Sequence, residues 1–186
     1  MANWYTADTH FNHANIISFC NRPFHTLDEM HEALISNWNS LVAKDDTVYF
    51  LGDFCFEPKK SLVLKWIAKL NGHIILIRGN HDHKYTRKAF SLNWHDELEI
   101  QIGKYNCILT HRPLYPDGWE VPKRDITNHF ARSAAYKKYD FIISGHIHGL
   151  RLWTGRSLNV GVDIHDFTPL SEANILALLE EFENHV

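Results

Sequence analysis

"LIRGNHDHKY" (residues 76–85) changes within four positions from apolar residues to glycine, amide, imidazole and carboxylate side chains. Its apolar part belongs to "HIILIRG" (73–79), and consecutive branched residues of this kind are typical of a strand covered on both faces of a sheet. The polar cluster is therefore predicted at the carboxyl end of a buried strand. In open α/β sheets this is the edge at which ligands bind.

Other β-prone segments end in the same way. Their ranges are 3–8, 47–53, 105–111 and 140–146, and each ends in Asp or His. The carboxyl ends of parallel strands meet at one edge of a sheet, so these side chains are expected to gather around one site.

Two helices are predicted between the first three strands. The segment 26–43 carries the capping-box pair Thr26 and Glu29, followed by apolar residues at helical spacing. The segment 58–72 has Pro58 at its expected first helical position. The first half of the chain is thus predicted to have the order β-α-β-α-β.

The second half is richer in strands. Hairpins are predicted over 97–111 and 149–163, with 159–163 interpreted as a core strand and turn, and a C-terminal helix is predicted over 172–182. Between the hairpins, residues 111–125 are expected to form a loop. Its basic residues Lys123 and Arg124 are expected to overhang the site, together with Arg112. No linker or repeat divides the chain, so a single domain over 1–186 is predicted.

Composition excludes several classes of function. The net charge of -3 gives no general attraction to nucleic acid or to an anionic membrane, so no broad nucleic-acid binding is expected. Nowhere do about 18 apolar residues follow one another, and we expect a cytoplasmic protein with no membrane partner. The three cysteines have no C-x-x-C spacing, so neither a disulfide framework nor a cysteine zinc site is predicted. The fourteen histidines are unusually many.

The strand ends supply carboxylate, amide and imidazole side chains. This mixture of ligands suits Mn²⁺, Fe or Zn²⁺ better than Ca²⁺. In Asp8-x-His10 and His146-x-His148, the spacing of two predicts that both side chains project to one side of an extended segment. Together the strand ends provide enough ligands for two metal ions.

Five separated motifs resemble those of the calcineurin-like metallophosphoesterases, in the order in which that family carries them. They span residues 8 to 148 and are Asp8-Thr9-His10, Gly52-Asp53, Gly79-Asn80-His81-Asp82, Thr110-His111 and Gly145-His146-Ile147-His148. The resemblance implies an α/β fold, the four-layer α-β-β-α sandwich of this family. It also implies the activity of a metal-dependent phosphoric ester hydrolase.

The resemblance further implies two divalent ions, with Mn²⁺ the first choice and Fe, Zn, Ni or Co as alternatives. Asp53 would bridge the ions and count, with His81, as a catalytic residue. The other ligands would divide into Asp8, His10 and His148 for one ion, and Asn80, His111 and His146 for the other.

The implied reaction is attack of a metal-bridging hydroxide on phosphorus, with His81 protonating the departing oxygen or stabilising its charge. Three residues are candidates for contacting the substrate phosphate: Arg112, His13 and Asn12. Asp82 is expected to accept backbone hydrogen bonds in its turn, and His83 to lie on the surface.

The motifs depart from the family's pattern at two places, and the first of these departures narrows the expected substrate. Phe56 and Glu57 stand where the protein-phosphatase branch carries Asp and Arg, so phosphoproteins are disfavoured. Thr110 replaces the glycine that commonly precedes the fourth-motif histidine. The small chain resembles the compact bacterial and phage phosphoesterases, whose implied substrates are small phosphodiesters or nucleotide-type phosphates. The alternatives are a non-catalytic binding module that retains the fold, or a small nuclease.

Overall fold

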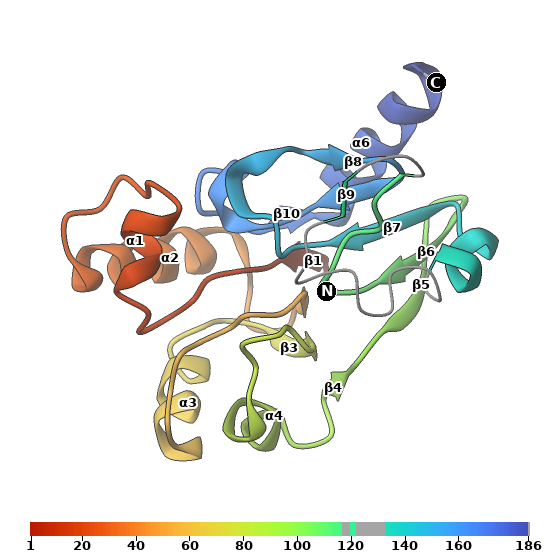
Figure 1. Cartoon of the computed structure of the whole chain (residues 1–186). Helices are drawn as coiled ribbons and strands as arrows, with labels where there is room; N and C mark the ends of the chain where they lie inside the picture. The colour runs from red at the N-terminus through yellow and green to blue at the C-terminus, as the bar shows by residue number, and fades with distance from the viewer. Residues whose placement is uncertain (117–119, 122–132, 186) are drawn as a thin grey trace.

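The structure is a computed structural model that describes residues 1–116, 120–121 and 133–185. Within these residues the strands form two five-stranded sheets (Figure 1). The first sheet has the order β10-β1-β2-β3-β4, in which β1 to β4 are parallel and β10 is antiparallel to β1. Its strands are β1 (Asn3–Thr6), β2 (Thr47–Phe50), β3 (His73–Ile77), β4 (Trp94–His95) and β10 (Leu170–Ser171). The β-α-β-α-β prediction for this half is confirmed.

The second sheet has the order β5-β6-β7-β9-β8. Its strands are β5 (Leu98–Ile102), β6 (Tyr105–Leu109), β7 (Phe141–Ser144), β8 (Trp153–Thr154) and β9 (Ser157–Asn159). Both predicted hairpins are present, as β5–β6 and β8–β9. The core strand and turn predicted over 159–163 is confirmed only in part, because β9 ends at Asn159 and the buried chain then turns into the 3₁₀ helix η3 (Val162–Ile164).

Helices cover the outer face of the first sheet and one end of the sandwich, and the short η1 lies on the outer face of the second sheet. They are α1 (Asn15–Phe19), α2 (Leu27–Leu41), α3 (Lys60–Ile67), α4 (Lys84–Phe90) and α6 (Glu172–His185), with the 3₁₀ helices η1 (Tyr136–Lys138) and η2 (His148–Leu150). Thr26 caps α2 by accepting from the backbone N of Glu29, at 3.1 Å, as its sequence predicts. Pro58 is not the first residue of α3, because the backbone at Lys59 is extended and the helix begins only at Lys60.

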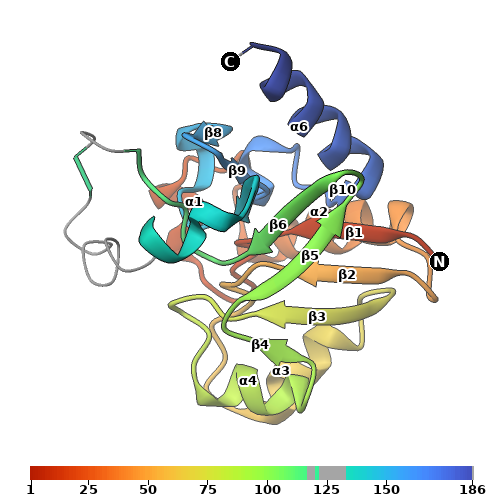
Figure 2. The same ribbon diagram turned by 90° about the vertical axis from the view of Figure 1, so that its right-hand side faces the viewer.

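Three apolar clusters define the layers, and in Figure 2 strands β5 and β6 of the second sheet lie in front of β1 and β2 of the first. One packs α2 and α3 against the first sheet, and a second lies between the two sheets, where α6 closes it with Ile175 and Leu179. A third covers the outer face of the second sheet, where Tyr136 of η1 packs on Ile108 and Ile142. The predicted four-layer arrangement is confirmed. None of the helices in the described part of the chain is both long and apolar enough to cross a bilayer.

Replacing Phe50 with alanine should lower the free energy of unfolding by about 3–5 kcal/mol, because it leaves a cavity in a packed aromatic cluster. Phe50 is fully buried on β2, and its ring centroid lies 5.1 Å from that of Phe54 and 6.2 Å from that of Trp38. Urea unfolding measures the loss. Leu41→Ala, at an exposed position of α2, is the control and should change stability by less than about 1 kcal/mol. Equal losses in the two variants would contradict this account of the core.

Candidate metal centre

The site lies where parallel strands of both sheets end. Asp8, Asp53 and Asn80 follow β1, β2 and β3 of the first sheet, while His111 and His146 follow β6 and β7 of the second. Backbone hydrogen bonds tie the loops together within each sheet. The N of Asp8 donates to the O of Gly52 at 2.9 Å, and the N of Gly145 donates to the O of His111 at 3.0 Å. The expected convergence of strand ends therefore occurs, and it joins the two sheets at one place.

Left-handed backbone, rather than extended backbone, turns the paired ligands toward one point. The φ angles are 62° at Asp8, 51° at His10, 74° at His146 and 48° at His148. The prediction that each pair projects from an extended segment is therefore wrong. A residue in the left-handed region reverses the local chain direction, and this turn is what brings each pair of side chains inward.

Two glycines allow the loops to approach as closely as they do. A Cβ atom on Gly79 would lie 2.2 Å from Oδ1 of Asp53, and one on Gly52 would lie 2.5 Å from Nδ1 of His111. Both distances are far below contact, so a side chain at either position would displace a proposed ligand. This explains why the Asp53 and Asn80 motifs each begin with glycine.

The first cluster consists of Asp8, His10 and His148, whose ligand atoms lie within 4.8 Å of one another. Oδ1 of Asp8 and Nε2 of His10 are buried and have no hydrogen-bond partner, and they lie 4.0 Å apart. Buried polar atoms are nearly always paired, so two unpartnered atoms facing each other indicate a missing ligand between them. A divalent cation fits, because burial lowers the pKa of His10 and keeps its imidazole lone pair free.

The second cluster consists of Asp53, His111 and His146. Nε2 of His111 lies 3.3 Å from Oδ2 of Asp53 and 3.2 Å from Nδ1 of His146. Oδ1 of Asn80 lies 3.1 Å from the same His111 nitrogen. The structure therefore brings together the four residues that the resemblance assigns to the second ion, including the neutral oxygen of Asn80.

Asp53 lies between the two clusters. Its Oδ2 is 3.6 Å from Nε2 of His10 in the first cluster and 3.3 Å from Nε2 of His111 in the second. Its Oδ1 accepts a hydrogen bond from the backbone N of His81 at 2.8 Å, which fixes the orientation of the carboxylate. Burial acts to raise the pKa of Asp53, but His111 and His10 outweigh it and hold this pKa well below its usual range. The carboxylate is therefore ionised, and one of its oxygens faces a histidine nitrogen of each cluster.

In the absence of bound ions, nearby carboxylates raise the pKa values of two of the imidazoles. Burial acts to lower the pKa of His111, but the Asp53 carboxylate outweighs it and raises this pKa to about 9. Burial is likewise outweighed at His148, where the hydrogen bond with Asp163 raises the pKa to about 10. Burial raises the pKa of Asp8 to about 6. Metal ions binding here would displace protons from these ligands.

Sequence reasoning missed two residues that position the ligands. Nδ1 of His148 lies 2.9 Å from Oδ2 of Asp163, and this contact fixes the orientation of a ring that groups with Asp8 and His10. Arg22 is buried and binds both carboxylate oxygens of Asp163, at 2.8 and 3.0 Å. The sequence did contain a signal for Asp163, because this residue follows β9 in the way that Asp8 and Asp53 follow β1 and β2.

Arg22 also holds the first ligand loop directly. Its Nη2 donates to the backbone O of Asp8 at 2.7 Å, and its Nη1 donates to the O of Thr9 at 3.0 Å. One buried guanidinium thus links Asp163 to the Asp8 loop. The order of the first cluster depends on this link, because Arg22 contacts both the loop of one ligand and the partner of another.

Asp163→Asn should weaken binding of the first metal ion by about 10- to 100-fold, the usual effect of removing the partner of a ligating histidine. The amide cannot fix His148 as a carboxylate does, and it loses the ion pair with Arg22. Competition with a chelating dye measures the affinity. Asp166→Asn, three residues away and exposed, is the matched control. Unchanged affinity in Asp163→Asn would show that His148 is oriented by other contacts.

The residues flanking the ligands of the third motif behave as predicted. Asp82 is buried and accepts from the backbone N of Asp53 at 2.8 Å, of Phe54 at 3.0 Å and of Gly79 at 2.8 Å. It therefore ties the second and third motifs together as a structural residue. His83 is exposed, at the start of α4.

Of the residues predicted to act in catalysis or to contact the substrate, His81 and His13 lie beside His10 of the first cluster. His81 is half-buried, with its ring centroid 5.5 Å from that of His10, and Nδ1 of His13 lies 3.4 Å from Nδ1 of His10. Asn12 is exposed, and its backbone N donates to Nε2 of His31 at 3.0 Å. Arg112 is half-buried beside His111. Lys123 and Arg124 lie outside the described residues.

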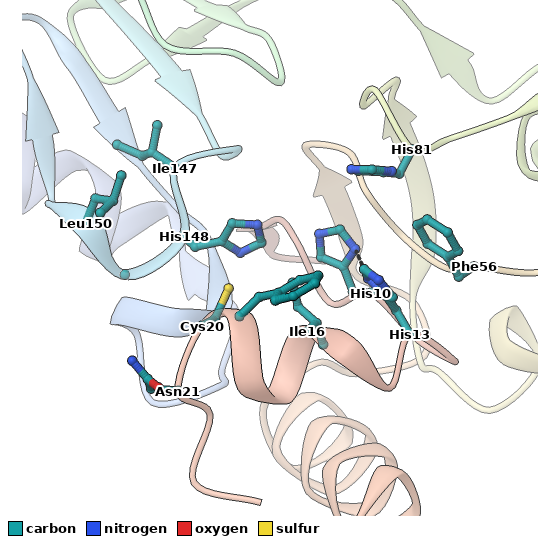
Figure 3. A pocket seen from close by; sticks show the side chains of 12 residues that line it. His10, His13, Ile16, Cys20, Asn21, Phe56, His81, Ile147, His148 and Leu150 are labelled. Atoms are coloured by element: carbon teal, nitrogen blue, oxygen red, sulfur yellow. Dashed lines mark hydrogen bonds between the residues drawn. The ribbon is translucent and has the colours of Figure 1, made fainter. Parts of the chain in front are cut away.

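Beside the clusters is a cavity of about 710 Å³, shown in Figure 3. His10 and His148 of the first cluster line it, together with His81 and His13. Among the described residues, neither Asn12 nor Arg112 belongs to its lining. The cavity therefore gives access to the first cluster from the side on which His81 lies.

Two packed sheets with carboxylate and imidazole clusters at their strand ends define a metallophosphoesterase-type fold. The calcineurin-like phosphoesterase superfamily domain matches residues 1–161, and the chain belongs to this superfamily. The resemblance drawn from the five motifs is thereby confirmed.

Relatives of similar length extend this finding. An uncharacterised protein of Methanocaldococcus jannaschii is 37% identical over 181 residues, covering 94% of this chain and 89% of the relative. The Gene 66 protein of Mycobacterium phage D29 is 27% identical over 193 residues, covering 91% and 92%. A crystal structure of a protein of unknown function from Aquifex aeolicus has a TM-score of 0.79 and 25% identity, covering 95% of this chain and 98% of that one.

Proposed function

We propose that this protein is a dinuclear metal-dependent phosphoesterase that hydrolyses small phosphodiesters or nucleotide-type phosphates. The position of Asp53 carries the proposal, because one carboxylate oxygen lies within 3.6 Å of a histidine nitrogen from each cluster. A protein that used the fold only as a scaffold would have no need for this arrangement. Mn²⁺ is the first candidate for both ions, and Fe, Zn, Ni or Co are the alternatives.

The chain's own residues would orient the ester and assist the departing group. Two bound cations would supply an activated water and neutralise charge on the phosphoryl oxygens. Asn80 contributes a neutral oxygen, which limits the negative charge that an anionic phosphate meets. His81 donates its backbone N–H to Oδ1 of Asp53, and its side chain lines the cavity beside the first cluster, where the imidazole would protonate the departing oxygen or stabilise its charge.

The surroundings of the site support a small substrate rather than a phosphoprotein. Glu57 stands where the protein-phosphatase branch has arginine, and its Oε1 accepts from Nε1 of Trp66 at 2.7 Å. Glu57 is thus held against α3, and position 57 provides no positive charge for a phosphoprotein phosphate. We accordingly propose a small phosphate ester as the partner, in a cytoplasmic setting, without a membrane partner or broad nucleic-acid binding.

The test is hydrolysis of bis(4-nitrophenyl) phosphate by Mn²⁺-loaded protein, compared with 4-nitrophenyl phosphate and a phosphopeptide. We expect the diester to be hydrolysed fastest, because the site offers no guanidinium at position 57 for a dianionic phosphoprotein ester. Metal binding without turnover of any ester would favour the non-catalytic binding module. Faster hydrolysis of the phosphopeptide would place the protein in the protein-phosphatase branch, and cleavage of single-stranded DNA in preference to the diester would favour a nuclease.

A further inference from the structure

The cavity beside the first cluster has a wall of aromatic rings that ends at the proposed catalytic histidine. His13 and Phe56 stack, with centroids 4.2 Å apart and planes at 16°, and the Phe56 centroid lies 5.2 Å from that of His81. At the other end, the ring of Phe19 lies 6.3 Å from that of His13 in an edge-on arrangement. The wall therefore runs from the protein surface to the point where the ester oxygen would depart.

The cavity also gathers exposed apolar side chains. Phe19 is 71% exposed, Leu150 is 72% exposed and Phe56 is 37% exposed, and all three line it. Figure 3 shows Leu150 and Ile147 on the side of the cavity opposite Phe56 and His81, with His10 and His148 between them. Apolar side chains gathered in one exposed place, rather than scattered singly, mark a binding surface.

The charge of the lining restricts what can bind. Among the described residues, the lining contains no lysine, arginine, aspartate or glutamate, and its titratable groups are histidines and Cys20. With His10 and His148 engaged as metal ligands, a second phosphate in the cavity would find no further strong cation, and an ammonium group would find no carboxylate. An uncharged group matches this lining, and the volume of about 710 Å³ is within the usual range for a small-molecule site.

We propose that this cavity is a subsite for an uncharged aromatic ring, either an aryl group or a nucleobase, carried on the departing arm of the ester. This inference rests on the proposed function, because the role of His81 there defines the side of the site on which the leaving group of the ester would lie. The ring packs against Phe19 and the His13–Phe56 stack, with Leu150 covering its other face. Phe19 and Leu150 are therefore specificity-determining residues.

The test is calorimetric binding of two matched ligand pairs to Mn²⁺-loaded protein. Phenylphosphonate and ethylphosphonate share one head group and differ by the ring, and adenosine 5′-monophosphate and ribose 5-phosphate differ by the base. We expect the ring-bearing member to bind about 10-fold more tightly, within the range for stacking of one ring on aromatic side chains. A preference in the first pair alone assigns the cavity to aryl groups, one in the second pair alone to nucleobases, and a preference in both pairs assigns it to either ring.

The double variant Phe19→Ala/Leu150→Ala should reduce that preference to below about 3-fold and leave the affinity for ethylphosphonate unchanged. Both side chains are exposed, so their truncation spares the core. The control is Leu92→Ala/Leu64→Ala, at leucines that are 90% and 42% exposed elsewhere on the surface. Equal affinities within each pair, or a preference that survives the double variant, would overturn the subsite.

Failure of the proposed function would look different. Protein that prefers the ring-bearing ligands but hydrolyses no ester retains the subsite and loses the proposed activity. Protein that hydrolyses bis(4-nitrophenyl) phosphate but shows no ring preference retains the activity and loses the subsite.

Discussion

Stripping divalent metal from the protein should abolish diester hydrolysis while both sheets remain folded. Three of the proposed ligands are also held by contacts that do not involve an ion. Oδ2 of Asp8 accepts from the backbone N of His146 at 2.8 Å, Nδ1 of His111 lies 2.7 Å from the O of Leu51, and Nδ1 of His148 contacts Asp163. The site therefore keeps its framework when empty, whereas the activation of water and the neutralisation of phosphate charge are lost together.

Chelation followed by add-back of Mn²⁺ measures this result, with hydrolysis of the nitrophenyl diester and far-ultraviolet circular dichroism followed on the same sample. Activity should disappear with chelation and return with Mn²⁺, while the dichroism spectrum changes little. Full activity in protein shown by elemental analysis to be free of metal would end the dinuclear proposal. Loss of the spectrum together with the activity would show instead that the ions are structural.

His81→Ala should keep both metal ions and lose roughly 10²–10⁴-fold in hydrolysis rate, the usual contribution of a positioned acid. The loss should be smallest with nitrophenyl esters, because a leaving oxygen of low basicity needs little protonation. It should be largest with alkyl or nucleoside leaving groups. Rates across a leaving-group series, together with metal content by elemental analysis, measure both effects.

Asn80→Ala is the matched variant, because Asn80 is the neighbouring residue and its Oδ1 faces His111 in the second cluster. It should lose the second metal ion, so the two variants are expected to fail in different ways. A His81→Ala protein that binds no metal would make His81 a ligand and reverse the assignment of these two residues.

The parallel strands could be predicted from sequence because each is a short apolar run that ends abruptly in a polar residue. The family motifs then connected those ends to one site. The two-residue strands β4 and β10 could not be predicted, since they carry too few residues to show a pattern and exist only through pairing with β3 and β1. The short α1 was missed for the same reason.

Long-range contacts account for the misses within the site. Arg22 and Asp163 are 141 positions apart, and nothing local to either residue reveals their ion pair. The left-handed backbone at His10 and His148 could not be predicted either, because glycine in a sequence indicates that conformation and histidine does not. Spacing correctly predicted that the ligands converge, but the backbone conformation by which they do so depends on the folded structure.

Those left-handed histidines imply that the site and the stability of the fold are in competition. At about 1–2 kcal/mol for each non-glycine residue in this region, His10, His146 and His148 together disfavour folding by on the order of 3–6 kcal/mol. This is a sizeable fraction of the roughly 5–15 kcal/mol that stabilises a typical domain. Selection for stability alone would favour glycine at all three positions. The histidines therefore give up part of the fold's stability to place their imidazoles, and bound metal ions would add to the free energy of unfolding of a protein that is already folded without them.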